Sequence, residues 1–141
     1  MKILIDTNVL IDYVTSREPY TKTANAIMNQ CINEQIEGYI AIHSILNMFY
    51  ILRKVMTDTS ERKKQLEDLT EFLDMVEIDS AMMLRALHNE EFTDFEDCIQ
   101  SECAVKVQAD YIVTRNEKDF IHSKVKVISP EKFLDVIKEM A

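Results

Sequence analysis

The sequence predicts a single α/β domain, residues 1–141, built on a parallel sheet whose two faces are covered by helices. Short apolar runs typical of buried strands alternate with longer segments whose apolar residues recur at helical spacing. The first run, residues 2–5, is continuous rather than alternating, as expected for a strand covered on both faces. With 141 residues, of which 47% are hydrophobic, the chain can bury one core.

The expected elements follow one another in a regular order. The expected strands are residues 2–5, 39–42, 75–78, 111–113 and 125–128. The expected helices lie after Asp6, over 21–37, over 44–55, after Asp58, over 79–88, over 94–108 and from Pro130 to the C-terminus. This alternation implies parallel strands joined by helices.

Several residues mark the helix ends. Gly38 is placed to end the helix over 21–37, and Ser44 can cap the next one. Asp58 and Asp79 occupy N-cap positions of later helices, and Pro130 suits the first position of the terminal helix.

Composition excludes several classes of function. The net charge of −9 argues against a protein that coats nucleic acid through overall attraction, so any contact with nucleic acid must be local. A single glycine excludes the glycine-rich loops that bind nucleotide cofactors. No apolar run approaches the roughly 20 residues that span a bilayer, and no secretory signal is visible, so a cytoplasmic protein is expected. The three cysteines, Cys31, Cys98 and Cys103, are interpreted as reduced core thiols.

Three polar segments are expected to meet at one edge of the sheet. Asp6 ends the first strand, and residues 114–120 follow the strand over 111–113. Asp94 and Asp97 share one face at the start of a helix. Carboxylates brought together in this way favour a divalent cation, and all-oxygen ligands indicate Mg²⁺ or Mn²⁺. The structural alternative is that these acids only cap helices.

The ordered set of motifs resembles the PIN-domain nucleases, most closely the VapC-type toxins of bacterial and archaeal toxin–antitoxin pairs. The motifs are Asp6-Thr7-Asn8 after an apolar strand, the helix with Asp94 and Asp97, Thr114-Arg115-Asn116, and Asp119-Phe120. The resemblance implies a three-layer α/β/α fold with a central parallel sheet of about five strands. It also implies an Mg²⁺- or Mn²⁺-dependent endoribonuclease in which an activated water cleaves RNA.

The resemblance assigns a role to each matching residue. Asp6 and Asp97 match metal-binding aspartates, and Asp94 matches an additional acid found in part of the family. Asn116 and Asp119 fall in the more variable last site segment. The supporting polar positions are Thr7, Asn8 and Thr114. Turn formation is the alternative interpretation of Asn116 and Asp119.

The chain departs from the family pattern at one position. PIN nucleases usually carry a glutamate in the helix after the second strand, and Asn47 stands there instead. Two hypotheses follow. Either Asp94 restores the missing charge from the opposite helix, or the domain is catalytically weakened and binds RNA or a protein partner without cutting it.

Further residues concern the substrate and the partners. Arg115 and Lys118 flank the expected site and are candidates for contact with RNA phosphates. Residues 48–52, with Met82 and Met83, carry more apolar side chains than one helix face needs. They either pack in the core or form a surface for a second copy of the chain, as a homodimer, or for an antitoxin segment. A small-molecule phosphohydrolase is disfavoured because the first strand offers one aspartate rather than Asp-x-Asp.

Overall fold

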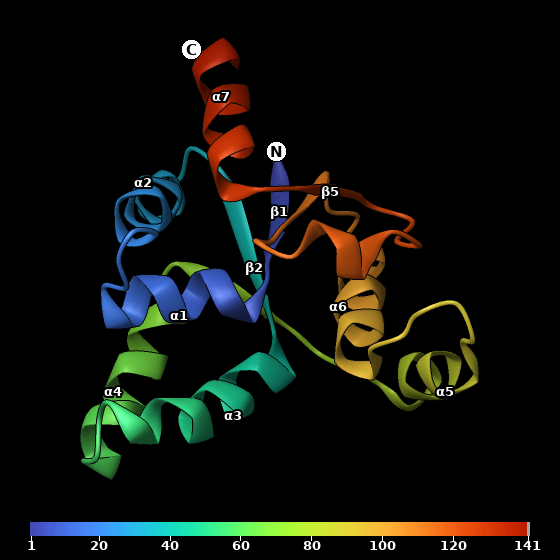
Figure 1. The fold of residues 1–141 in the computed structure, drawn as a ribbon, viewed down its shortest axis with the longest axis horizontal. Coiled ribbons are helices and arrows are strands. Elements are labelled where there is room, and N and C mark those ends of the chain that lie inside the picture. The colour runs from blue at the N-terminus through green and yellow to red at the C-terminus, as the bar shows by residue number, and fades with distance from the viewer. Residues whose placement is uncertain (141) are drawn as a thin grey trace.

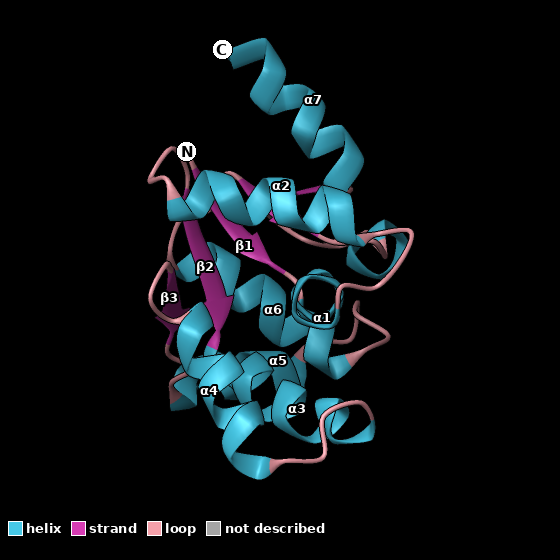
Figure 2. Cartoon of the chain, turned by 90° about the vertical axis from the view of Figure 1, so that its left-hand side faces the viewer, coloured by secondary structure: helices cyan, strands magenta, loops and turns pink. Residues whose placement is uncertain are grey.

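In the computed structural model, which describes residues 1–140, a five-stranded parallel sheet lies between two layers of helices (Figures 1 and 2). The strands, in the spatial order β3-β2-β1-β4-β5, are β1 (Lys2–Ile5), β2 (Glu37–Ala41), β3 (Leu73–Val76), β4 (Tyr111–Val113) and β5 (Lys126–Ile128). The helices are α1 (Thr7–Thr15), α2 (Thr21–Ile32), α3 (Ile42–Ile51), α4 (Thr59–Leu69), α5 (Ser80–His88), α6 (Phe95–Lys106) and α7 (Pro130–Met140). The predicted three-layer α/β/α architecture is confirmed.

The two faces of the sheet have separate cores. On one face, α1, α2, α4 and α7 contribute buried side chains such as Leu10, Ile27, Leu69 and Phe133. On the other face, α5 and α6 bury a smaller set that includes Ala86. Figure 1 shows α1 and α2 on one side of β1 and α6 on the other. Central strand β1 is therefore buried on both faces, as its continuous apolar sequence predicts.

Polar side chains begin several helices where the sequence predicts them. Asp58 Oδ1 accepts hydrogen bonds from the backbone N–H groups of Ser60 and Glu61. Asp79 Oδ1 accepts one from Met82 N, and Pro130 is the first residue of α7. These caps satisfy N–H groups that have no partner within the helix.

Gly38 does not end a helix, so that prediction was wrong. Helix α2 ends at Ile32, and Glu34, with φ of 58°, completes the turn that leads into β2. Gly38 lies inside β2, where an added Cβ would come within 2.5 Å of Leu73 Cδ2 and 2.7 Å of Cys31 Sγ. The glycine thus allows α2 and the neighbouring strand to pack closely against β2.

Ser44 is not a helix cap either. Helix α3 begins at Ile42, directly after β2, and places Ser44 in its interior with no exposed surface.

The third strand starts at Leu73, two residues earlier than predicted, because Leu73 and Val76 are its buried residues. The three cysteines are free and buried, in agreement with their interpretation as core thiols. Within residues 1–140, no helix is long and apolar enough to cross a membrane.

Candidate active site

Asp6 lies at the carboxyl edge of the sheet, between two central strands. It follows β1 and is the N-cap of α1, where its Oδ1 accepts a 2.8 Å hydrogen bond from Thr7 N. Its Oδ2 accepts a 2.7 Å hydrogen bond from the hydroxyl of Thr114. Thr114 follows β4, which pairs with β1 in parallel register. The parallel pairing explains why residues 108 positions apart meet at one point.

Asn8 and Asn116 extend this hydrogen-bonded corner. Asn8 Nδ2 donates to Asp6 Oδ2 at 3.3 Å and to Thr114 Oγ1 at 3.4 Å. Asn8 Oδ1 accepts from the backbone N–H of Arg115, and Asn116 N donates to Thr114 Oγ1 at 3.0 Å. The structure thus brings Asn8, Thr114 and Asn116 together around Asp6, as the sequence predicts.

A buried polar network behind Asp6 was missed by the sequence analysis. Thr7 Oγ1 donates to Ser44 Oγ at 2.9 Å, and Gln100 Nε2 donates to Ser44 Oγ at 2.9 Å and to Thr7 Oγ1 at 3.3 Å. Ser44 and Gln100 are completely buried. The network fixes the starts of α1 and α3 against α6, and α6 carries the other acidic residues of the candidate site.

The second group of carboxylates surrounds the first turn of α6. Asp94 is the N-cap of this helix, and its Oδ1 accepts a 3.0 Å hydrogen bond from Asp97 N. Burial, together with the negative charges of Asp94, Asp6, Asp119 and Glu96, raises the pKa of Asp97 to about 7. The acids that act on Asp97 thus come from three segments: Asp6 follows β1, Asp94 and Glu96 lie at the start of α6, and Asp119 lies in the segment after β4. The predicted convergence of these three segments is present.

The pKa of Asp6 is also raised. Burial raises the pKa of Asp6, while hydrogen bonds from Thr114 and from Thr7 N oppose this change. Glu96 raises it further, because the two carboxylates repel each other. The site is thus a group of acids with an incompletely balanced charge.

This donor set suits a hydrated divalent cation rather than a closed metal cage. Within residues 1–140, no group of three or more His, Cys, Asp or Glu side chains is arranged to hold a metal ion as it stands. Mg²⁺ commonly binds through one or two carboxylates and keeps several of its waters. Asp6 and Asp97 suit that mode, because the negative charge of Asp6 contributes to the raised pKa of Asp97 and a cation between the two carboxylates would relieve this repulsion.

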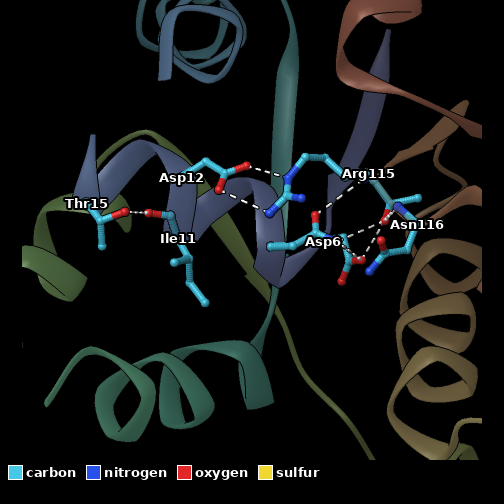
Figure 3. Close-up of polar contacts among 8 residues, drawn as sticks. Asp6, Ile11, Asp12, Thr15, Arg115 and Asn116 are labelled. Carbon is cyan, nitrogen blue, oxygen red and sulfur yellow. Dashed lines mark hydrogen bonds and ion pairs between the residues drawn. The ribbon is translucent and has the colours of Figure 1, made fainter. Parts of the chain in front are cut away.

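Arg115 and Lys118, the predicted phosphate contacts, have different surroundings. Arg115 Nε and Nη2 donate to the two carboxylate oxygens of buried Asp12 at 2.7 and 3.2 Å (Figure 3). Its guanidinium carbon also lies 3.9 Å from the ring centroid of Tyr20. A phosphate bound by Arg115 would therefore have to compete with Asp12. Lys118 is exposed in the short 3₁₀ turn Glu117–Phe120.

Asn47 faces an acid that the sequence analysis did not assign to the site. Asn47 is partly buried on α3, four residues after His43. Across from them, Glu96 in the first turn of α6 has an Oε1 atom 3.6 Å from His43 Nε2. The only sequence signal for Glu96 was its position between Asp94 and Asp97. Its contacts with α3 depend on how the two helices pack.

Comparison with known proteins agrees with this geometry. The sequence pattern of the PIN domain matches residues 2–118. No curated protein matches the sequence. The structure of VapBC2 from Rickettsia felis bound to a promoter DNA fragment has a similar fold, with a TM-score of 0.66 and 14% identity, over 92% of this chain and 98% of that chain.

Two further solved structures have the same fold. A toxin–antitoxin complex from Klebsiella pneumoniae matches with a TM-score of 0.64 and 23% identity, over 91% of this chain and 97% of that chain. FitAcB from Neisseria gonorrhoeae matches with a TM-score of 0.65 and 18% identity, over 92% of this chain and 98% of that chain. At these identities the likeness concerns the fold, whereas the sequence pattern covers most of the chain. The chain belongs to the PIN-domain family.

Proposed function

We propose that this protein is an Mg²⁺- or Mn²⁺-dependent endoribonuclease and the toxin of a toxin–antitoxin pair. The observation that carries the proposal is the gathering of Asp6, Asp94, Asp97 and Asp119 at the carboxyl edge of the sheet. Burial of Asp97 and the negative charges around it raise its pKa to about 7. Membership of the PIN-domain family supports nuclease chemistry. The structural neighbours, which are toxin–antitoxin complexes, support the toxin role.

In this proposal Asp6 and Asp97 hold the metal. The bound ion would supply a water of lowered pKa and would neutralise charge on the phosphodiester. Thr114 and Thr7 N orient the Asp6 carboxylate through hydrogen bonds to its two oxygens. Asp119 adds negative charge beside Asp97.

The other predicted site residues lie near the two proposed metal ligands. Asp94 fixes the first turn of α6 by accepting from Asp97 N. Asn116 lies beside Thr114, where it can orient a water molecule. Exposed Lys118 is placed in the following turn, where its ammonium group can contact the RNA backbone. Such local contacts would offset the repulsion between RNA and a chain of net charge −9.

Asp6→Asn tests the proposed activity. We expect the wild-type protein to cleave RNA in the presence of Mn²⁺ or Mg²⁺, and we expect cleavage to stop when EDTA is added. The Asp6→Asn variant should not cleave RNA, because the amide removes one anionic ligand of the metal. Asparagine can still accept the cap hydrogen bond from Thr7 N, so the fold should persist. The products are measured by gel electrophoresis of a labelled RNA.

Asp135→Asn on the exposed face of α7 is the matched control, since it removes the same charge away from the site. Undiminished cleavage in Asp6→Asn would contradict the proposal. RNA binding without cleavage, in every metal tried, would instead favour a weakened PIN domain, for which Asn47 is the specific observation.

We further propose that the chain forms a homodimer through an apolar groove. The groove has a volume of about 580 Å³ and is lined by residues of α3, α4 and β3, including Leu46, Tyr50 and Met75. Leu46 is 60% exposed and Tyr50 is 55% exposed. Met48 and Leu52 of the same segment are buried in the core. The core interpretation of residues 48–52 therefore holds for Met48 and Leu52, whereas the partner interpretation is part of this proposal and concerns exposed Tyr50.

Leu46→Glu tests the homodimer. We expect light scattering to give the mass of two chains for the wild type and of one chain for Leu46→Glu, because a carboxylate in an apolar interface loses its hydration. Leu87→Glu is the control, since Leu87 of α5 is 61% exposed and lies outside the groove. A monomeric wild type would contradict the homodimer and leave the groove to an antitoxin segment.

A further inference from the structure

We infer that Glu96 of α6 supplies the negative charge that Asn47 of α3 cannot provide, and that His43 and Asn47 hold its carboxylate toward the proposed metal site. The inference rests on the proposed function and concerns how this chain completes that site. In this inference Asp6 and Asp97 are the direct ligands, and Glu96 acts through its charge and through water.

The first support is the packing of the two helix starts. His43 and Asn47 are four residues apart and therefore lie on one face of α3. Glu96 Oε1 approaches His43 Nε2 to 3.6 Å from the first turn of α6. Figure 1 shows this end of α6 beside the start of α3. Both ring nitrogens of His43 are buried, and neither forms a hydrogen bond within residues 1–140. The imidazole is therefore free to pair with Glu96.

The second support is the position of Glu96 beside the proposed metal ligands. Glu96 directly precedes Asp97 in the first turn of α6, and its carboxylate faces the start of α3. The negative charge of Glu96 also raises the pKa of both Asp6 and Asp97. Glu96 is therefore placed to add negative charge to the site that these two aspartates form.

Asp94 is less suited to replace the missing acid. Its Oδ1 already accepts the capping hydrogen bond from Asp97 N, and its side chain is exposed. Glu96 instead reaches across to α3, the helix that carries position 47, where its carboxylate lies 3.6 Å from His43 Nε2.

This arrangement gives Asn47 a definite role. A glutamate at position 47 would place a second carboxylate next to Glu96, and the two would repel each other. An amide at this position can instead donate to the Glu96 carboxylate. Asn47 together with Glu96 therefore provides the same number of negative charges as a glutamate on α3, with the carboxylate moved to α6.

The test is calorimetric titration of Mn²⁺ into the folded protein, which does not depend on cleavage. We expect Glu96→Gln to weaken Mn²⁺ binding about 10- to 100-fold, as losses outside the direct ligand shell typically do. The double variant Glu96→Gln with Asn47→Glu should regain most of the affinity, because it returns one carboxylate to the same place. Glu90→Gln, at an exposed position before α6, is the matched control and should bind as the wild type does.

The outcomes separate this inference from the proposed function. If Glu96→Gln binds Mn²⁺ like the wild type while Asp6→Asn does not bind it, Glu96 has no such role and the metal site stands. Weak binding in Glu96→Gln without recovery in the double variant would overturn the exchange with position 47. If the wild type binds no Mn²⁺, or if Asp6→Asn binds it equally well, the proposed metal site fails and this inference fails with it. Circular dichroism of each variant verifies that it is folded.

Discussion

Asp12→Ala is expected to lower the free energy of unfolding by about 3–5 kcal/mol, the usual cost of removing one partner of a buried ion pair. The Asp12 side chain is 2% exposed, and both of its oxygens accept hydrogen bonds from Arg115 at 2.7 and 3.2 Å. Alanine would leave the guanidinium, which is 20% exposed, without a carboxylate partner. Urea unfolding at neutral pH, followed by circular dichroism, measures the loss.

A double variant distinguishes the cost of an unpaired charge from the net contribution of the pair. Asp12→Leu combined with Arg115→Met should be less destabilised than Asp12→Ala, because no buried charge remains without a partner. Asp135→Ala, on an exposed face, should change stability by no more than about 0.5 kcal/mol. A loss below about 1 kcal/mol in Asp12→Ala would mean that water replaces the carboxylate.

The ion pair between Asp12 and Arg115 also helps to hold the segment after β4 next to Asp6. Arg115 directly follows Thr114, the residue that donates to Asp6, and its backbone N–H donates to Asn8. Holding the Arg115 side chain against α1 therefore fixes the backbone on which Thr114 and Asn116 depend. The sequence analysis considered only a phosphate contact for Arg115, because its acidic partner lies 103 positions earlier in the chain.

The meeting of several predicted site residues at the sheet edge was predictable because these residues follow a recognisable strand or begin a helix. Asp6 and Thr114 end apolar strands, and the ends of parallel strands share one edge whatever the order of the strands in the sheet. Asp94 and Asp97 have the spacing of an N-cap and the first helical turn. Local sequence was therefore enough to predict that these groups meet.

Ser44, Gln100 and Glu96 could not be placed in the same way. Ser44 resembles a helix cap in sequence, and its contacts with Thr7 and Gln100 span 37 and 56 positions. Gln100 resembles any polar helical residue until its complete burial is known. Gly38 was assigned to a helix end because the sequence does not show how closely Leu73 and Cys31 approach it. These features depend on the packing of elements that are distant in the chain.

Asp97→Asn is expected to lower metal-dependent RNA cleavage roughly 10²- to 10³-fold, the loss typical of removing one preorganised electrostatic group. The same change should stabilise the metal-free protein at alkaline pH. Four neighbouring acids repel the Asp97 carboxylate, and an uncharged amide avoids that repulsion while it keeps nearly the same shape. The backbone N–H of residue 97 still donates to Asp94, so the cap of α6 is retained.

The direction of the pH effect follows from the raised pKa. Asp97 titrates at about 7 in the folded protein and near its ordinary value of about 3.9 in the unfolded chain, so the folded state binds more protons between these values. Its contribution to stability is complete at low pH and is lost as the pH rises through about 7. Because the side chain is only partly buried, screening by solvent limits the advantage of Asp97→Asn at alkaline pH to about 1–2 kcal/mol.

Urea unfolding of the wild type and Asp97→Asn in EDTA, at acidic and at alkaline pH, measures this advantage, since the contributions of the other titrating groups largely cancel in the difference. An advantage that does not grow with pH would contradict the raised pKa of Asp97. Added Mn²⁺ should stabilise the wild type more than the variant, because a ligand that binds only the folded state stabilises it in proportion to its affinity. The repulsion among the acids destabilises the metal-free protein, and the same charges attract the cation, so Asp97→Asn must lose metal binding as it gains stability.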